Sequence, residues 1–467
     1  MNAAYNSYEK QLIEKYPKYK ELLDSGRIDS GVRSDKFFKQ EQLKELIPRD
    51  HCYISYSVVK KDEASNTREN EILAFVADET GEVKSFSIPV DEKFFAACQV
   101  YHDLLEYPHL KKMQGKYLWK MSDGSYFLTK TRQQLKGASV VNTAEGFRNA
   151  KQELAELLGE KLLAPLTQYI SAKKTWIISP DGELNLLPFE TLNFNGRLAV
   201  EAADICYVPS LAVLKLMKEA GEKNSALGNR LELFAMGNAE YGSVFNYDRR
   251  GNAELLEKIK LNPNMYVDLT QLKWRNVAGT GVELEKVSAL FPANTQKMLT
   301  CSAASERNLK QLDRSGELGQ YRRILLGAHG LFIPERPDLN SIVLSQGLDD
   351  AENDGYVTVG EIFGYKLQSD LVYLSACESG RGDYHAGEGI IGLPYALTVA
   401  GNKDTVMSLW EVDDKATAEF TAAVFEKLSR GESEVRALNE TKREFLKNPS
   451  AELNSSSVWA AFLLYGF

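Results

Sequence analysis

Hydrophobic and polar residues alternate over several short segments in the first half of the chain. Asp78-Glu79-Thr80-Gly81 separates two of these segments, and such residues are typical of a tight turn. Because side chains on a strand point alternately to its two faces, the pattern predicts a β-meander, followed by a hairpin over residues 116–130. The predicted meander strands are 51–59 (HCYISYSVV), 71–78 (EILAFVAD) and 83–90 (VKSFSIPV), with helical periodicity over 92–112 and 144–170.

Beyond residue 230 the pattern changes, and short apolar runs alternate with amphipathic helical stretches. Apolar runs without alternation are typical of strands that are buried on both faces by helices, as in parallel sheets. The sequence therefore predicts an α/β fold, an α/β/α sandwich with a mostly parallel central sheet. The runs that we assign to strands are 231–239, 296–300, 321–330, 371–377 and 405–412.

The chain has 467 residues, too many for a single hydrophobic core of ordinary size. The stretch GEKNSALGNR (221–230) is polar and contains Gly, Ser and Asn, which indicates a boundary. We expect three parts: an N-terminal helix within residues 1–30, a β-rich N-terminal domain over 31–225, and a second domain over 226–467.

Composition narrows the classes of protein to consider. The net charge of −9 disfavours binding to the phosphate backbone of nucleic acids. No window approaches the roughly 20 apolar residues of a membrane-spanning helix, and the charged first residues do not resemble a secretory signal. Five scattered cysteines fit a reducing cytoplasm, and no residue spacing typical of a zinc site occurs. We therefore expect a cytoplasmic protein without a metal or other cofactor.

Two of the predicted strands end in residues that can carry chemistry. The run ILLGAHG ends at His329-Gly330, and LVYLSAC ends at Cys377. The carboxyl ends of parallel strands meet at one edge of a sheet, and ligand sites lie beyond that edge. Histidine can take the proton of a thiol or protonate a leaving amine, so His329 and Cys377 form a candidate acid–base and nucleophile pair. The amides of Gly330 and Cys377 are candidates for an oxyanion hole.

The other candidates have simpler explanations. His385 lies in a glycine-rich loop only eight residues after Cys377, and we expect it at the surface. The acidic loop 348–358 lacks the full ligand spacing of a calcium loop and is expected to be a solvated turn. The remaining cysteines are expected to be small packed side chains: Cys52, Cys98, Cys206 and Cys301.

These motifs resemble those of the CHAT proteases, caspase-like cysteine peptidases of clan CD. SACESG is similar to the family's SACxS/TG, and GAHG to its His-Gly strand end. A departure is Ala328, since the family often has Ser or Thr before the histidine. The resemblance covers about residues 160–467 and includes 178–192 (ISPDGELNLLPFETL), 208–214 (VPSLAVL), 387–401 (GEGIIGLPYALTVAG), 405–420 (TVMSLWEVDDKATAEF) and 459–466 (WAAFLLYG).

The resemblance implies a caspase-like fold and an endopeptidase that works through an acyl-enzyme, with His329 as acid–base and Cys377 as nucleophile. It also implies an inactive caspase-like half before the active one, for which residues 31–225 are the candidate. Family members often carry helical repeats at the N-terminus and occur in bacterial defence and cell-death systems. This chain offers one such helix, so we expect a regulatory protein or a helical-repeat partner in addition to a protein or peptide substrate.

The resemblance further points to a specificity pocket after the strand that ends in Leu409-Trp410. Trp410, Glu411, Asp413 and Asp414 are the candidates, and a carboxylate at the pocket base would favour Arg or Lys before the scissile bond. The alternative is that Asp413 or Asp414 caps the following helix.

The roles of two carboxylates that follow Cys377 in the sequence stay open. Glu378 and Asp383 follow the nucleophile and either orient neighbouring backbone or are solvated loop residues.

The alternatives to an endopeptidase are a catalytically silent scaffold or adaptor of the same fold and a thiol amidase that acts on small molecules. A long groove beside Cys377 would favour protein substrates, and a closed pocket would favour small ones.

Overall fold

The computed structural model describes most of the chain. Of the predicted features, the helix within residues 1–30, Cys377, Glu378, Asp383, His385 and Glu411 lie outside the described residues, as does part of the acidic loop 348–358. The described ranges are 40–59, 70–107, 116–130, 137–242, 249–262, 268–277, 279–333, 336–347, 352–375, 388–410 and 412–467.

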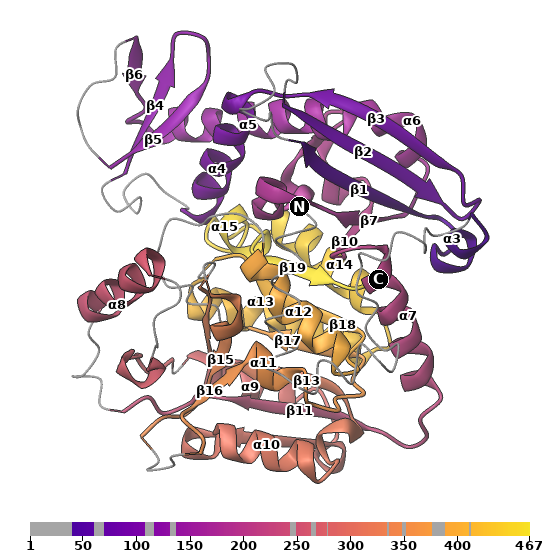
Figure 1. Cartoon of the computed structure of the whole chain (residues 1–467), viewed down its shortest axis with the longest axis vertical. Helices are drawn as coiled ribbons and strands as arrows, with labels where there is room; N and C mark the ends of the chain where they lie inside the picture. Colours follow the sequence, from indigo (N-terminus) through magenta and orange to yellow (C-terminus); the bar gives the residue numbers. More distant parts are fainter. Residues whose placement is uncertain are drawn as a thin grey trace.

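One eleven-stranded sheet runs through the molecule, from β3 at the top of Figure 1 past β19 to β11 near the bottom. Neighbouring strands are parallel except at β18–β19, β1–β2 and β2–β3. The predicted α/β fold with a mostly parallel sheet is therefore confirmed, as is the antiparallel meander. In spatial order the strands are Gln296–Thr300 (β12), Leu231–Gly237 (β11), Tyr321–Gly327 (β13), Leu371–Leu374 (β17), Asp404–Ser408 (β18), Phe462–Tyr465 (β19), Asp204–Tyr207 (β10), Thr175–Ser179 (β7), His51–Val59 (β1), Glu71–Asp78 (β2) and Val83–Pro89 (β3).

Helices cover the sheet in two groups, which makes the predicted three-layer sandwich. In one group α13 packs against both α9 and α14, and in the other α12 packs against both α7 and α11. Several helices begin at a Ser, Thr or Asp whose side chain accepts a backbone N–H, as in Ser210 before α7. The helices are Gln40–Leu46 (α3), Glu92–Glu106 (α4), Ala144–Leu162 (α5), Thr167–Ile170 (α6), Leu211–Ser225 (α7), Arg249–Leu261 (α8), Gly279–Ser288 (α9), Glu306–Arg314 (α10), Val359–Ile362 (α11), Glu388–Val399 (α12), Asp414–Ser429 (α13), Glu434–Leu446 (α14) and Ser456–Trp459 (α15).

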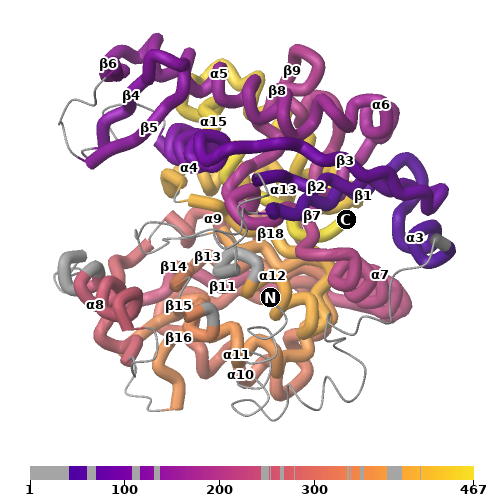
Figure 2. Tube along the Cα trace, turned by 45° about the horizontal axis from the view of Figure 1, so that its top comes forward, coloured from indigo at the N-terminus to yellow at the C-terminus, as the bar shows by residue number. Residues whose placement is uncertain are grey.

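Three small sheets accompany the central one in the described part of the chain. The sheet of β14, β15 and β16 matters for the site, because β14 begins two residues after β13 ends, and Figure 2 shows β14 beside β13. The strands of the small sheets are His329–Leu331 (β14), Ser341–Val343 (β15) and Tyr356–Thr358 (β16); Tyr117–Met121 (β4), Tyr126–Thr129 (β5) and Ala138–Val140 (β6); and Asn193–Phe194 (β8) and Arg197–Leu198 (β9).

The two parts of the chain that meet near residue 225 share the central sheet. The predicted boundary falls between α7 and β11, but β19 pairs with β18 on one side and with β10, from the first part, on the other. A buried ion pair between Lys442 of α14 and Glu190 joins the same two parts, and the Tyr207 hydroxyl donates to Glu190 at 2.5 Å. The assignment of residues 31–225 as a separate, inactive caspase-like domain stays a prediction.

Within the described ranges, no helix is both long enough and apolar enough to cross a membrane.

Candidate active site

The two strands that were predicted to carry the reactive residues are parallel neighbours. Leu326 of β13 lies opposite Leu374 of β17, and the Ser375 amide donates to the Leu326 carbonyl at 3.1 Å. Both strands therefore end at the same edge of the sheet. His329 follows β13 by two residues, and Cys377 follows Ser375 by two residues in the sequence. The contact between the imidazole and the thiol stays a prediction, because Cys377 lies outside the described residues.

The ring of His329 is held in one orientation by a backbone carbonyl. Its side chain is buried, and Nε2 lies 2.7 Å from the carbonyl oxygen of Arg275. A carbonyl oxygen can only accept, so Nε2 carries the proton, and in the neutral ring Nδ1 is the basic nitrogen. This contact comes from the segment before α9, and it orients the ring without help from the side chain of Ala328.

Two aromatic side chains enclose the same imidazole. The centroids of the Trp274 and Tyr241 rings each lie 4.9 Å from that of His329. Both rings are themselves fixed by hydrogen bonds, since the Tyr241 hydroxyl donates to the Val343 carbonyl at 2.7 Å and the Trp274 indole N–H donates to the Tyr356 hydroxyl at 2.7 Å. These contacts could not be predicted, because the residues are far apart along the chain.

Gly330, the predicted oxyanion donor, lies in β14 opposite Ile342 of β15. It is buried and directly follows the histidine. Its role as a donor stays a prediction.

A buried glutamate that was not predicted lies beside the end of β17. The Ser375 hydroxyl donates to Glu283 Oε2 at 2.6 Å. Burial and, to a smaller extent, nearby Asp414 raise the pKa of the Glu283 carboxyl group to about 7, although the hydroxyls of Ser375 and Thr421 lower it in part. Glu283 thus lies in direct contact with Ser375, two residues before the candidate nucleophile Cys377 in the sequence.

The candidate pocket residues have different roles in the structure. Trp410 is buried, and its indole N–H donates to the Ser457 carbonyl at 2.8 Å, so it anchors the segment that follows β18. Asp413 caps α13, accepting the amides of Lys415 at 3.0 Å and Ala416 at 3.3 Å.

Asp414 is exposed and packs against the start of α9. A Cβ on Gly279 would lie 2.3 Å from the Cβ of Asp414, so only glycine fits at that position. Asp413 therefore has the capping role that was the predicted alternative. Asp414 stays a candidate for binding a cationic substrate side chain.

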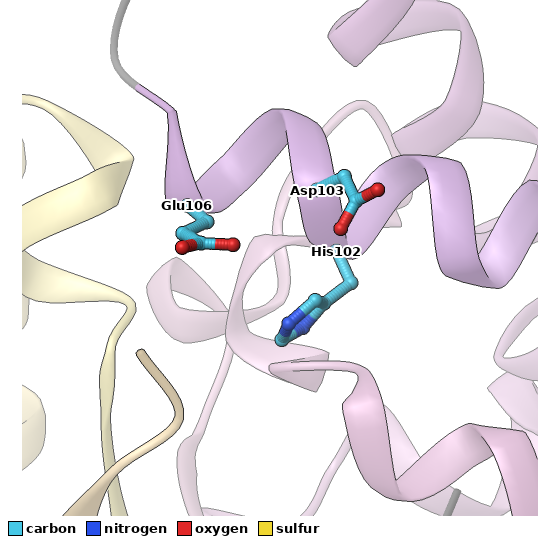
Figure 3. A group of neighbouring side chains, drawn as sticks. All are labelled: His102, Asp103 and Glu106. Carbon is cyan, nitrogen blue, oxygen red and sulfur yellow. The ribbon is translucent and has the colours of Figure 1, made fainter. Parts of the chain in front are cut away.

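One cluster of side chains has the composition of a metal site. His102, Asp103 and Glu106 all come from α4, and their ligand atoms lie within 4.8 Å of one another (Figure 3). Nδ1 of His102 lies 3.0 Å from the Leu186 carbonyl, however, and Asp103 forms an ion pair with Lys116 at 2.9 Å. A cation would have to displace that lysine, so we assign the cluster a packing role.

Comparisons with known proteins agree with the motifs. The family model for the CHAT domain matches residues 152–467, which confirms the resemblance. No curated protein matches the chain.

Two of the similar solved structures have low sequence identity to this chain. The separase–securin complex of Saccharomyces cerevisiae has 12% identity and a TM-score of 0.45, over 92% of this chain and 31% of that chain. The Arg specific cysteine proteinase gingipain R has 10% identity and a TM-score of 0.36, over 69% of this chain and 68% of that chain. The protein thus spans about a third of the length of the separase chain.

Proposed function

Since the chain belongs to the CHAT domain family, we propose that it is a cysteine endopeptidase that hydrolyses peptide bonds through Cys377 and His329. The observation that carries this proposal is the pairing of β13 with β17. These strands end side by side, with His329 beyond one and the sequence leading to Cys377 beyond the other. A caspase-like sheet with this placement supports acyl transfer at its carboxyl edge.

The orientation of His329 defines the proton path. Nε2–H is held by the Arg275 carbonyl, so Nδ1 accepts the proton of the Cys377 thiol. The thiolate attacks the carbonyl carbon of the scissile peptide, and the N–H groups of Gly330 and Cys377 stabilise the oxyanion. When the tetrahedral intermediate collapses, the C–N bond breaks and His329 gives its proton to the departing amine. Water, deprotonated by His329, then hydrolyses the thioester and regenerates the thiol.

The proposed specificity is for Arg or Lys before the scissile bond. Asp414 carries it, because its carboxylate lies at the start of α13, just past the segment that Trp410 anchors. A guanidinium or ammonium group would form a charge-assisted hydrogen bond with this carboxylate. Regulation by a partner protein and action in the cytoplasm are part of the same proposal. The first follows from the family resemblance, and the second from the few scattered cysteines.

A fluorogenic peptide-library screen tests the proposal. Wild type should cleave a subset of peptides, Cys377→Ala and His329→Ala should be inactive, and Cys301→Ala should cleave like wild type. Cys301 is the matched control, since it is the other cysteine at a strand end and is only half-buried. Cleavage that persists in Cys377→Ala would contradict the proposal. Turnover restricted to small amides would identify a small-molecule amidase instead, and a wild type inert to every substrate would favour a scaffold.

A further inference from the structure

Helix α9 touches the ends of the strands that lead to both proposed catalytic residues. A Cβ on Gly327, the last residue of β13, would lie 2.9 Å from the Cβ of Thr280, so the first turn of the helix is in close contact with that strand end. One turn further on, Glu283 accepts the hydrogen bond from Ser375 just beyond β17. The helix therefore fixes the two strand ends relative to each other.

Burying a glutamate side chain at this position is energetically unfavourable. Its side chain is 1% exposed, and Oε1 has no hydrogen-bond partner among the described residues. An ionised carboxylate buried in this way would need a cation or several donors. Glu283 has no ion-pair partner in the described part of the chain, and Asp414 adds a negative charge nearby. A neutral carboxylic acid satisfies these surroundings better than a carboxylate.

The remaining neighbours supply no compensating charge. From β17 the titratable group that faces Glu283 is Tyr373, whose pKa is raised well above 10.0 by burial, so it stays neutral. From α13 the facing groups are Thr421 and Asp414. The contacting end of β13 is glycine, and on α9 itself Glu285 is exposed. Ionisation of Glu283 therefore places an uncompensated negative charge beneath the end of β17.

We propose that Glu283 is a positioning residue for the nucleophile, an inference that rests on the proposed function. In its uncharged form Glu283 holds Ser375 and thereby fixes the end of β17 that leads to Cys377. Ser375 is itself almost fully buried, so its hydroxyl has few other ways to be satisfied. When Glu283 loses its proton, the buried charge displaces this strand end, and the reactivity of Cys377 falls. The enzyme would then be less active on the alkaline side of neutral pH than its catalytic pair alone allows.

Two variants of Glu283 separate this role from simple packing. Glu283→Gln keeps the shape and the hydrogen bond with Ser375 but cannot ionise, and Glu283→Leu removes the hydrogen bond. Glu285→Gln, on the exposed side of the same helix, is the matched control. The measurements are the rate at which iodoacetamide alkylates Cys377, followed by mass spectrometry with Cys301 as internal reference, and kcat/KM for the best peptide of the screen.

The expected result is a pH-dependent ratio between variant and wild type. For Glu283→Gln the ratio of alkylation rates should be near one at about pH 6 and rise severalfold at about pH 8.5, because only wild type ionises there. Glu283→Leu should slow alkylation about tenfold or more at about pH 6, since small displacements of a reacting group are costly. The ratio for Glu285→Gln should stay near one throughout.

A ratio for Glu283→Gln that does not change with pH would overturn the proposal. Equal alkylation of wild type and a folded Glu283→Leu would also overturn it, and if the leucine variant does not fold, the glutamine variant decides alone. Alkylation does not require a peptide substrate. A wild type that cleaves nothing but shows the expected alkylation ratios would reject the peptidase and retain the positioning role.

Discussion

Replacing Glu283 by Gln should change how the free energy of unfolding depends on pH. The folded state raises the pKa of this carboxyl group from 4.5 to about 7, mainly because the side chain is buried. Between these values the folded protein keeps a proton that the unfolded chain has released. The stability linked to this proton is therefore fully present below about pH 4.5 and is lost as the pH rises through about 7.

The size of the effect follows from the two pKa values. The difference between them corresponds to about 3 kcal/mol, of which about 2.5 kcal/mol falls between about pH 5 and pH 8. Wild type should lose this amount of stability relative to Glu283→Gln over that range. The carboxyl of Asp404, whose pKa burial raises to about 7, titrates in both proteins, so its contribution cancels in the comparison.

Urea-induced unfolding at a series of pH values measures the difference directly. Glu285→Gln serves as the control and should follow wild type at every pH. If the difference in unfolding free energy between wild type and Glu283→Gln were the same at both ends of the range, Glu283 would not titrate as its burial requires, and the reasoning would be refuted.

Two further predictions concern other parts of the chain. Glu190→Ala should lower the free energy of unfolding by about 3–5 kcal/mol, because it leaves the ammonium group of Lys442 buried without a counter-ion. In thermal or urea unfolding, the double variant Glu190→Leu with Lys442→Met should recover most of this loss. Equal losses in the single and the double variant would contradict the prediction. In the peptide screen, Asp414→Ala should reduce cleavage after Arg or Lys about a hundredfold, a loss of about 3 kcal/mol in transition-state binding. Asp413→Ala should keep the specificity and lower stability by about 1 kcal/mol through the lost cap. Unchanged specificity in Asp414→Ala would reject the assignment of Asp414.

Much of the fold could be predicted because it depends on local patterns. Alternation predicted the antiparallel meander of β1 to β3, and the unbroken apolar runs predicted the parallel strands that end near His329. The stretch 296–300, predicted as a strand, is β12 with the same bounds, Gln296–Thr300. In each case the residues that decide the structure are neighbours in the sequence.

The surroundings of the site could not be predicted, because they are formed by residues distant along the chain. A glutamate on an amphipathic helix ordinarily indicates the solvated face. Glu283 is buried only because α13 and the end of β17 cover it, and their positions depend on the order of strands in the sheet. Trp274 and the Arg275 carbonyl lie in a segment without periodicity, and only the folded chain brings them to His329.

The place of β19 in the sheet has a consequence for biosynthesis. This strand is translated after the others of the sheet, yet it fills the position between β18 and β10. Until the ribosome has released residues 462–465, the emerging polypeptide carries two open strand edges, at β18 and β10, in addition to the outer edges of the sheet. Such edges invite pairing with other chains. The nascent protein is thus most in need of a chaperone just before its synthesis reaches this strand.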